Sequence, residues 1–305
     1  MSDRVSKKEL QILEDFLKQR KISFIKDYNM GDYSSWKVGA ITKIIIFPDD
    51  IDTFKECILE LKRTNINFFI TGNATNTLFL NLFRTVIIST KKLKVIEFVT
   101  EDELVADCGC PLNLILNKSL GKGLVGFEFS TGIPGTVGGA LITNAGANGG
   151  SISDCLKSIF FLKDDKEIEV LKNEIQFDYR WSSIKKSDVI TRAKFKLHKG
   201  NVASTKAKIA AYIKHRNETQ PVQHPSAGSV FMNDEEVAAG KLIEDLGLKG
   251  LTVGGAQVSN LHANYIINTG GASANDIRDL INKIQNDCQV RRGIHLKTEV
   301  RIIDE

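Results

Sequence analysis

The spacing of apolar and polar residues in the first 90 positions predicts helices and short buried strands. An amphipathic helix near the start carries its apolar residues on one face, at Leu10, Leu13, Phe16 and Leu17. Short apolar runs predict three strands, at 43–47, 67–71 and 84–89. Between the first two strands, apolar residues recur at helical spacing. The chain therefore begins in the manner of a βαβ unit.

The pattern continues to about residue 200 with further strands and one helix. Strands are predicted at 95–99, 104–108, 157–162, 168–170 and 189–197. The helix begins at Pro111 and ends at Gly121, because proline suits a first helical turn and glycine suits a helix end. This part of the chain is thus mixed α and β.

From Val202 the pattern changes, which indicates a separate domain. It predicts helices from Val202, over 236–246 and from Ser273, where Asp276 stands at the capping-box position, with a short strand at 265–268. The last segment alternates and predicts a half-buried strand that returns to the first domain, with one face made of Leu296, Thr298, Val300 and Ile302. The predicted fold class is α+β.

Bulk composition is that of a globular, cytoplasmic protein. The chain has 305 residues, 42% hydrophobic and 26% charged, and no apolar run approaches the roughly 20 residues that cross a bilayer. The charged start lacks the apolar stretch of a signal peptide. Five scattered cysteines form no CxxC pair, so we expect reduced, mostly buried thiols and no metal site.

Charge gives little indication of a macromolecular partner. The net charge is +4, and the one basic run, 199–216, has the spacing of a solvated amphipathic helix. We therefore expect no nucleic-acid partner. We also expect no membrane insertion, because no long apolar run is present, and we favour a monomer although the oligomeric state is open. A mild positive excess suits anionic small molecules equally well.

Glycines concentrate in one segment and supply the first functional signal. Residues 121–150 hold 10 of the 24 glycines. Glycine allows positive φ and lets main-chain amides approach an anion closely, as phosphate-binding loops require. GKGLVG at 121–126 matches GxGxxG by letter but follows a helix, whereas a Rossmann fingerprint follows a strand, so we exclude that motif.

Seven ordered motifs, several of them in or near this segment, resemble those of the UDP-N-acetylenolpyruvoylglucosamine reductases. They are GNATN (72–76), GIPGTVGGA (132–140), NAGANG (144–149), YRWS (179–182), GSVFMN (228–233), GGAQVSNLHANYIIN (254–268) and LKTEV (296–300). The family carries FAD on a two-part fold shared with vanillyl-alcohol oxidase. The resemblance extends from about Ser34 to Arg301, nearly the whole chain.

The resemblance implies a three-part organisation with noncovalent FAD between the first two parts. These are an FAD-binding subdomain at 1–90 with the returning strand 295–305, a second at 91–200, and a substrate-binding domain at 201–294. The implied FAD contacts are Gly72, Asn73, Ala74, Thr75, Asn76, Thr131, Gly132, Ile133, Pro134, Thr136, Gly138, Gly139, Ala140, Asn144 and Gly146.

Arg180, Ser229 and Glu299 fall on the family's catalytic positions. In the family, NADPH reduces FAD and the flavin then passes the hydride to the vinyl carbon of the enolpyruvyl ether, which yields UDP-N-acetylmuramate for peptidoglycan synthesis. The enolate-like state needs fixed positive charge, which Arg180 offers, and Glu299 would assist in its protonated form. Ser229 would donate the proton once its hydroxyl is polarised.

Substrate contacts follow from the same resemblance, and the implied set is Tyr179, Arg216, Asn233, Lys249, His262 and Asn264. A lysine such as Lys249 suits a diphosphate as a point charge. The chain has no long insertion between Tyr179 and Gln220, so it resembles the subclass without the extra substrate-closing loop. Four positions depart from the family pattern: Met232 for Lys or Arg, Asp234 for Pro, Ala74 for Gly and Asn148 for an aromatic residue.

Two alternatives remain open from the residues. One is a related flavin oxidase that acts on an alcohol or aldehyde, but such enzymes often tether FAD through His or Cys, and no His precedes Gly132. The other is a flavin-binding protein without turnover, which the departures at Met232 and Ala74 keep open. Neither NADPH against NADH preference nor oligomeric state follows from the sequence.

Overall fold

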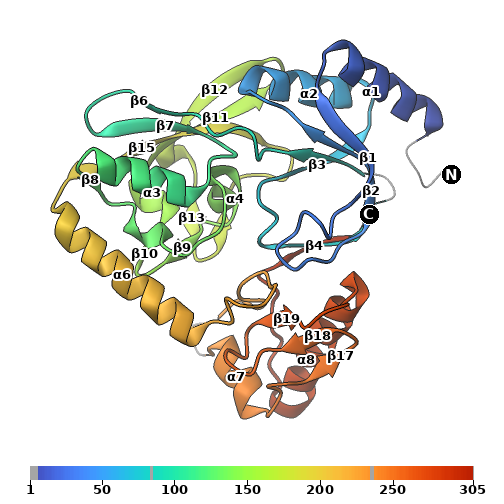
Figure 1. Ribbon diagram of the computed structural model, residues 1–305, viewed down its shortest axis with the longest axis vertical. Helices are drawn as coiled ribbons and strands as arrows, with labels where there is room; N and C mark the ends of the chain where they lie inside the picture. The colour runs from blue at the N-terminus through green and yellow to red at the C-terminus, as the bar shows by residue number, and fades with distance from the viewer. Residues whose placement is uncertain (1–5, 83–84, 234–236, 305) are drawn as a thin grey trace. The chain divides into compact units, whose positions relative to one another are not determined.

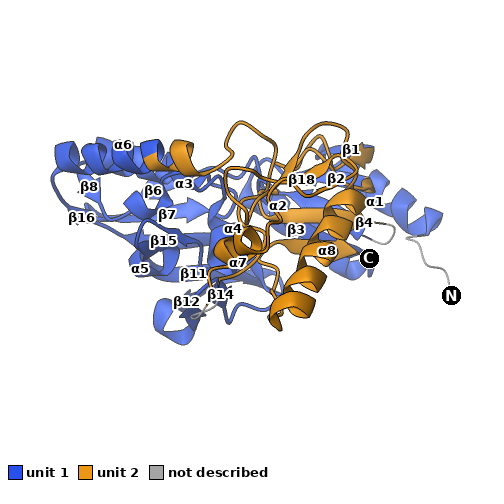
Figure 2. Ribbon diagram, turned by 90° about the horizontal axis from the view of Figure 1, so that it is seen from below, with its two compact units in different colours: residues 1–26, 44–73, 84–214 blue, residues 27–43, 74–83, 215–305 orange. Residues whose placement is uncertain are grey.

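The computed structural model describes residues 6–82, 85–233 and 237–304, and the chain forms two compact units (Figures 1 and 2). The first comprises 1–26, 44–73 and 84–214, and the second comprises 27–43, 74–83 and 215–305. The predicted strand start at Arg84 and the predicted helix start at Glu236 lie outside the described residues. The three-part division inferred from the sequence stays a prediction.

The start of the chain forms a small α/β layer. Its four strands lie in the order β1 (Ser23–Asn29), β2 (Ile41–Phe47), β5 (Thr85–Ser89) and β3 (Asn67–Thr71). β2 and β3 both run parallel to β5, as the predicted βαβ unit requires. The helices are α1 (Lys7–Gln19), with a capping box from Ser6, and α2 (Ile51–Arg63), capped by Asp50. α2 buries Phe54, Ile58 and Leu61 in the core of the first unit.

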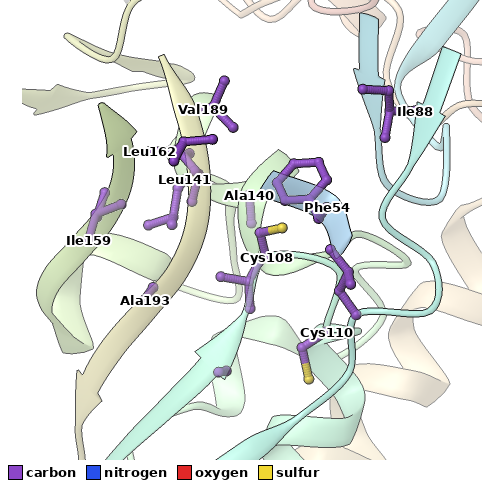
Figure 3. Packing of buried hydrophobic residues seen from close by; sticks show 14 of the residues in the cluster. Phe54, Ile88, Cys108, Cys110, Ala140, Leu141, Ile159, Leu162, Val189 and Ala193 are labelled. Atoms are coloured by element: carbon purple, nitrogen blue, oxygen red, sulfur yellow. The ribbon is translucent and has the colours of Figure 1, made fainter. Parts of the chain in front are cut away.

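A five-stranded antiparallel sheet forms the rest of the first unit's framework. Its order is β12 (Lys166–Leu171), β11 (Leu156–Lys163), β15 (Val189–Lys196), β7 (Glu103–Asp107) and β6 (Ile96–Phe98). The helices α3 (Leu112–Gly121) and α4 (Val137–Ile142) contribute Ile115 and Leu141 to the same apolar core. Figure 3 shows Cys108 and Cys110 among the apolar side chains of this core.

Short elements complete the first unit and carry much of the candidate site. They are β8 (Leu124–Val125), a 3₁₀ turn at Glu128–Ser130, β9 (Gly146–Ala147), β10 (Gly150–Ser151), α5 (Ile152–Cys155), a 3₁₀ turn at Lys172–Glu174, β13 (Phe177–Asp178), β14 (Trp181–Ser182) and β16 (His198–Lys199). The helix α6 (Val202–Thr219) then carries the chain from the first unit into the second.

The second unit has its own core, built around a three-stranded antiparallel sheet and a long helix. The strands are β17 (Thr252–Val253), β18 (Ala256–Val258) and β19 (Ile266–Asn268), and the helices are α7 (Ala239–Asp245) and α8 (Ala274–Arg292). α8 begins with the predicted capping box of Ser273 and Asp276. Trp36 is fully buried in this core, where its indole N–H donates to the Ile266 carbonyl at 2.7 Å.

The end of the chain corrects one detail of the predicted alternation. β20 (Arg301–Asp304) pairs in parallel with β4 (Thr77–Asn81), whereas residues 297–300 pair with the 230–232 segment. Leu296 and Val300 are buried as predicted, but Ile302 is 36% exposed and Ile303 takes the inner position at 7%. The chain changes partner after Val300, so the face that points inward also changes.

All five cysteines are free and buried, as predicted. Burial raises the pKa of Cys57 to about 12, and the same holds for Cys110 and Cys155. These thiols are therefore protonated at neutral pH and serve as small apolar residues. Within the described part of the chain, no helix combines the length and apolar character that crossing a membrane requires.

Candidate active site

Two glycine-bearing loops of the first unit meet at Gly72 and Thr136. A Cβ added to Gly72 would lie 2.1 Å from the Thr136 hydroxyl oxygen, a separation that real Cβ atoms do not show. The side-chain amide of Asn73 donates to the Pro134 carbonyl at 2.8 Å. The GNATN and GIPGTVGGA motifs are therefore in direct contact through Gly72 and Asn73 of the first motif. Their first residues, Gly72 and Gly132, are 60 positions apart in the sequence.

The second of these loops presents hydrogen-bond donors that the described residues do not use. Among those residues, none accepts a hydrogen bond from the main-chain amides of Gly132, Gly135, Thr136 and Gly139. The buried hydroxyl of Thr131 also has no partner in that part of the chain. Gly132 and Gly139 are exposed, so their amides are accessible to a ligand, and the buried Thr131 hydroxyl is costly without a partner. This donor set fits an anionic group such as the diphosphate of a dinucleotide.

Arg180 is held at the tip of a two-residue hairpin in the first unit. β13 and β14 pair Asp178 with Trp181, which leaves Tyr179 and Arg180 in the turn. Arg180 has φ +54°, a left-handed conformation that costs a residue other than glycine about 1 kcal/mol. Its Nη1 donates to the Gly146 carbonyl at 2.9 Å, and its Cζ lies 5.4 Å from the centre of the Tyr179 ring.

Asn144 and Asn148 connect the NAGANG loop to its surroundings, and both have positive φ. Asn144 donates from its side chain to the Asp178 carbonyl at 3.0 Å, beside the Arg180 turn. Asn148, where the family commonly has an aromatic residue, donates to the Thr131 carbonyl at 3.3 Å. Asparagine tolerates the left-handed conformation well, so the backbone at position 148 accommodates asparagine in place of the aromatic residue.

Ala74, the departure from the family's glycine, also has positive φ, at +50°. It is buried, and its carbonyl accepts the Ser35 main-chain amide at 3.3 Å within the second unit. Glycine reaches this conformation at no steric cost, whereas alanine does so with strain. The departure thus lies at a position whose backbone favours the family residue. Asp234 lies outside the described residues.

Ser229 and Glu299 lie on adjacent backbone segments of the second unit. The amide of Glu299 donates to the carbonyl of Val230 at 2.8 Å, and Phe231 forms an antiparallel bridge with Thr298. Both Ser229 and Glu299 are half-buried. The side chain of Asn76, from the GNATN motif, donates to the Glu299 carbonyl at 3.1 Å. The structure therefore brings together two of the three predicted catalytic residues within one unit, and Arg180 belongs to the other unit.

Comparison with known proteins places the chain in a family. Residues 42–171 match the model of an FAD binding domain, and residues 220–303 match that of the UDP-N-acetylenolpyruvoylglucosamine reductase C-terminal domain. The UDP-N-acetylenolpyruvoylglucosamine reductase of Clostridium botulinum (strain 657 / Type Ba4) is 40% identical over 282 residues, which cover 92% of each chain. The chain belongs to the UDP-N-acetylenolpyruvoylglucosamine reductase family.

Further members of the reductase family agree over nearly full length. The reductase of Caldanaerobacter subterraneus subsp. tengcongensis is 37% identical over 296 residues, which cover 96% of this chain and 97% of that one. The crystal structure of the Thermus caldophilus reductase matches with a TM-score of 0.79 at 27% identity and covers 93% of this chain and 99% of that one. The predicted family and fold class are confirmed, as is FAD as the cofactor.

Several residues proposed to contact substrate have partners within this reductase-family chain. Lys249 donates from Nζ to a carboxylate oxygen of Glu244 at 2.7 Å, and Asn233 accepts the Ala239 amide at 3.0 Å. Tyr179 is exposed and Arg216 is half-buried. Neither these two contacts nor the exposure of Tyr179 and Arg216 tests substrate binding, so the assignment of these residues to the substrate stays a prediction.

His262 is half-buried in the second unit, and its Nδ1 accepts the main-chain amide of Asn264 at 3.2 Å. Burial, followed by the positive charge of Lys249, lowers the pKa of His262, so the neutral ring is favoured. With Nδ1 as acceptor, the proton of the neutral ring is assigned to Nε2. His262 thus offers a donor, which is the form that suits an anionic ligand.

Asn264 differs most from its predicted environment. Its side chain is buried and bonds both its donor and its acceptor to the main chain of Phe231. Motif comparison selects Asn264 as a polar residue beside the substrate pocket but does not show where its amide points. The nearest signal in the sequence is its place between apolar residues at the start of a predicted strand.

Proposed function

We propose that this chain catalyses the NADPH-dependent reduction of UDP-N-acetylglucosamine enolpyruvate to UDP-N-acetylmuramate, with Arg180, Ser229 and Glu299 as its catalytic residues. The chain is an FAD-dependent oxidoreductase by its family and its FAD binding domain. One structural observation supports the roles more than any other. Ser229 and Glu299 stand on paired segments of one unit, which supports the proposal that a hydroxyl and a carboxyl group act at the same reaction centre.

Bound FAD would accept a hydride from NADPH and, once reduced, would pass it to the vinyl carbon of the substrate. The residues of the first unit fit the cofactor because the two loops pack closely at Gly72 and Thr136, and because none of the described residues accepts a hydrogen bond from the amides of Gly132, Gly135 and Gly139. In this proposal, the amides of Gly132, Gly135 and Gly139 hold the diphosphate, and the hydroxyl of Thr131 contributes a further hydrogen bond. The contacts bind and orient the cofactor and take no part in proton transfer.

The catalytic residues stabilise the negative charge that develops on the substrate and then protonate it. Hydride addition leaves negative charge on the carbon next to the vinyl terminus and on its carboxylate, and Arg180 offers a permanent cation to that charge. Glu299 assists as a protonated donor, because an ionised carboxylate would repel the anion. Ser229 then delivers one proton to that carbon and regains it from solvent.

The nucleotide end of the substrate requires separate contacts. We assign Lys249 and His262 to its diphosphate, because a lysine ammonium and the Nε2–H of a neutral histidine are both donors to phosphate oxygens. Lys249 bonds Glu244 in this structure, so binding would exchange one anionic partner for another. The enzyme would work in the cytoplasm, where its nucleotide substrates are found, and as a monomer.

A single assay tests the proposal against its two rivals. The purified protein is examined for noncovalent flavin by its absorbance, and NADPH oxidation is followed with and without UDP-N-acetylglucosamine enolpyruvate. We expect oxidation that depends on the enolpyruvyl substrate. Flavin without turnover would support a binding protein instead, and oxygen consumption with simple alcohols would support an oxidase.

A further inference from the structure

A single side chain holds the segment that comes after Ser229. Asn264 is 3% exposed, and its Oδ1 accepts the amide of Phe231 at 2.9 Å while its Nδ2 donates to the Phe231 carbonyl at 2.8 Å. Its own main-chain carbonyl accepts the amide of Val230 at 2.9 Å. Three hydrogen bonds therefore connect one residue to the two positions after Ser229.

The other edge of the same segment pairs with the strand that carries Glu299. Met232 donates its amide to the Lys297 carbonyl at 2.9 Å, and Glu299 donates its amide to Val230 at 2.8 Å. The segment thus lies between a true backbone partner on one edge and Asn264 on the other. An asparagine amide has the donor and acceptor of a peptide group, so it can replace a missing neighbouring strand.

We propose that Asn264 is a positioning residue, which orients the Ser229 hydroxyl relative to Glu299 by holding the Val230–Phe231 main chain. This inference rests on the proposed function. Asn264 uses both its side-chain polar atoms on Phe231, and its main-chain amide donates to His262 Nδ1 at 3.2 Å. The buried amide therefore acts on catalysis through the backbone rather than by contact with substrate.

Loss of this amide should affect proton delivery more than any earlier step. Without it, one edge of the Phe231 peptide has no partner, and a displacement of about 1 Å in a reacting group can slow a reaction on the order of a hundredfold. Protonation by the Ser229 hydroxyl draws the reversible hydride addition to completion, so its position affects reoxidation of the flavin by the substrate but not reduction of the flavin by NADPH. Loss of the amide should therefore slow reoxidation of the flavin by the substrate and leave its reduction by NADPH nearly unchanged.

The test compares Asn264→Ala with Asn268→Ala. Asn268 is a matched control in the same unit, because it is also buried and also bonds main chain, with Nδ2 donating to Trp36 at 3.0 Å and Oδ1 accepting Gly270 at 2.9 Å. Rapid-mixing absorbance follows flavin reduction by NADPH and flavin reoxidation by the enolpyruvyl substrate, in H₂O and D₂O. Thermal unfolding of both variants gives the structural effect separately.

We expect Asn264→Ala to slow reoxidation about tenfold to a hundredfold, to leave flavin reduction within about twofold, and to raise the solvent isotope effect on reoxidation. Asn268→Ala should lower the stability of the protein without slowing reoxidation more than reduction. Equal effects on both half-reactions, or an unchanged isotope effect, would overturn the proposal. If wild-type protein fails to reoxidise with the substrate, the proposed function fails instead.

A second variant covers the case in which Asn264→Ala does not fold. Asn264→Asp keeps an acceptor for the Phe231 amide and loses the donor to the Phe231 carbonyl. It should show the same separation of the half-reactions. If neither variant folds while Asn268→Ala does, Asn264 is a determinant of stability alone, and the positioning role is rejected.

Discussion

The main-chain amide of Glu299 donates a 2.8 Å hydrogen bond to the carbonyl of Val230, the residue next to Ser229 in the chain. This bond joins two catalytic candidates that are 70 residues apart, counted from Ser229 to Glu299. It belongs to the backbone, so it survives substitution of either side chain. Each side chain can therefore be removed singly while the pairing of the two segments is kept.

Ser229→Ala should disable proton delivery and leave the rest of the enzyme intact. Reoxidation of reduced flavin by the enolpyruvyl substrate should fall by about two to four orders of magnitude, the usual contribution of a positioned general acid. Reduction by NADPH should stay close to wild type, as rapid-mixing absorbance can check. Ser226→Ala, three positions earlier on the same segment, is the control. An equal loss in both half-reactions would exclude Ser229 as the donor.

Much of the framework follows from local patterns. The helix α8 begins where Ser273 and Asp276 predict it, and the buried strands of the first unit follow short apolar runs. Caps and periodicity act within a few residues of each other, so they are visible in sequence. The pairing of the Glu299 segment with the Ser229 segment has no such local signal, and the resemblance of whole motifs indicated only that both residues are catalytic.

The local sequence also gives no sign of where a strand changes from one pairing partner to another. The alternation from Leu296 predicts Ile302 on the inner face, but the chain changes from one partner to another after Val300 and buries Ile303. Asn264 shows the same limit for a polar residue. A motif can select its position, but the direction of its amide depends on Phe231, 33 positions away.

Gly72→Ala should weaken FAD retention, because the new Cβ would lie 2.1 Å from the Thr136 hydroxyl. Thr136→Ala removes that oxygen, and the nearest remaining atom, the Cβ of residue 136, lies 3.1 Å away. The double variant should therefore recover flavin relative to Gly72→Ala, with a coupling of about 0.5–3 kcal/mol. Flavin content after dialysis and the FAD dissociation constant measure this. Strictly additive losses would show that the two loops do not constrain each other.

Arg180→Gly should be more stable than Arg180→Ala, although both should lose turnover. Arg180 has φ +54°, where a Cβ costs about 1 kcal/mol and glycine has no such penalty. Both variants lose the cation and the bond to Gly146, so the comparison isolates the backbone. Thermal unfolding in the presence of saturating FAD provides the measurement. Equal stability of the two variants would mean that this turn carries no strain.

Glu167 should make the stability of the first unit depend on acid pH. Burial raises the pKa of its carboxyl, but hydrogen bonds from Arg192, Thr191 and Lys55 outweigh burial, and the net pKa lies below the usual 4.5. A carboxyl with a lowered pKa stabilises the folded state above its unfolded pKa, and this contribution disappears as pH falls through the folded value.

Glu167→Gln should therefore cost about 1–3 kcal/mol near pH 7, and the difference from wild type should shrink as pH falls below about 4.5. Burial raises the pKa of Asp107, and the negative charge of Glu167 raises it further, so Glu167→Gln also relieves Asp107 and the measured difference includes that smaller opposing contribution. Urea unfolding at a series of pH values gives the two stability curves, with the exposed Glu97→Gln as the control. If the wild-type and Glu167→Gln curves stay parallel down to the lowest pH at which both fold, the carboxylate does not stabilise the unit through its charge, and Arg192 and Lys55 contact it without energetic benefit.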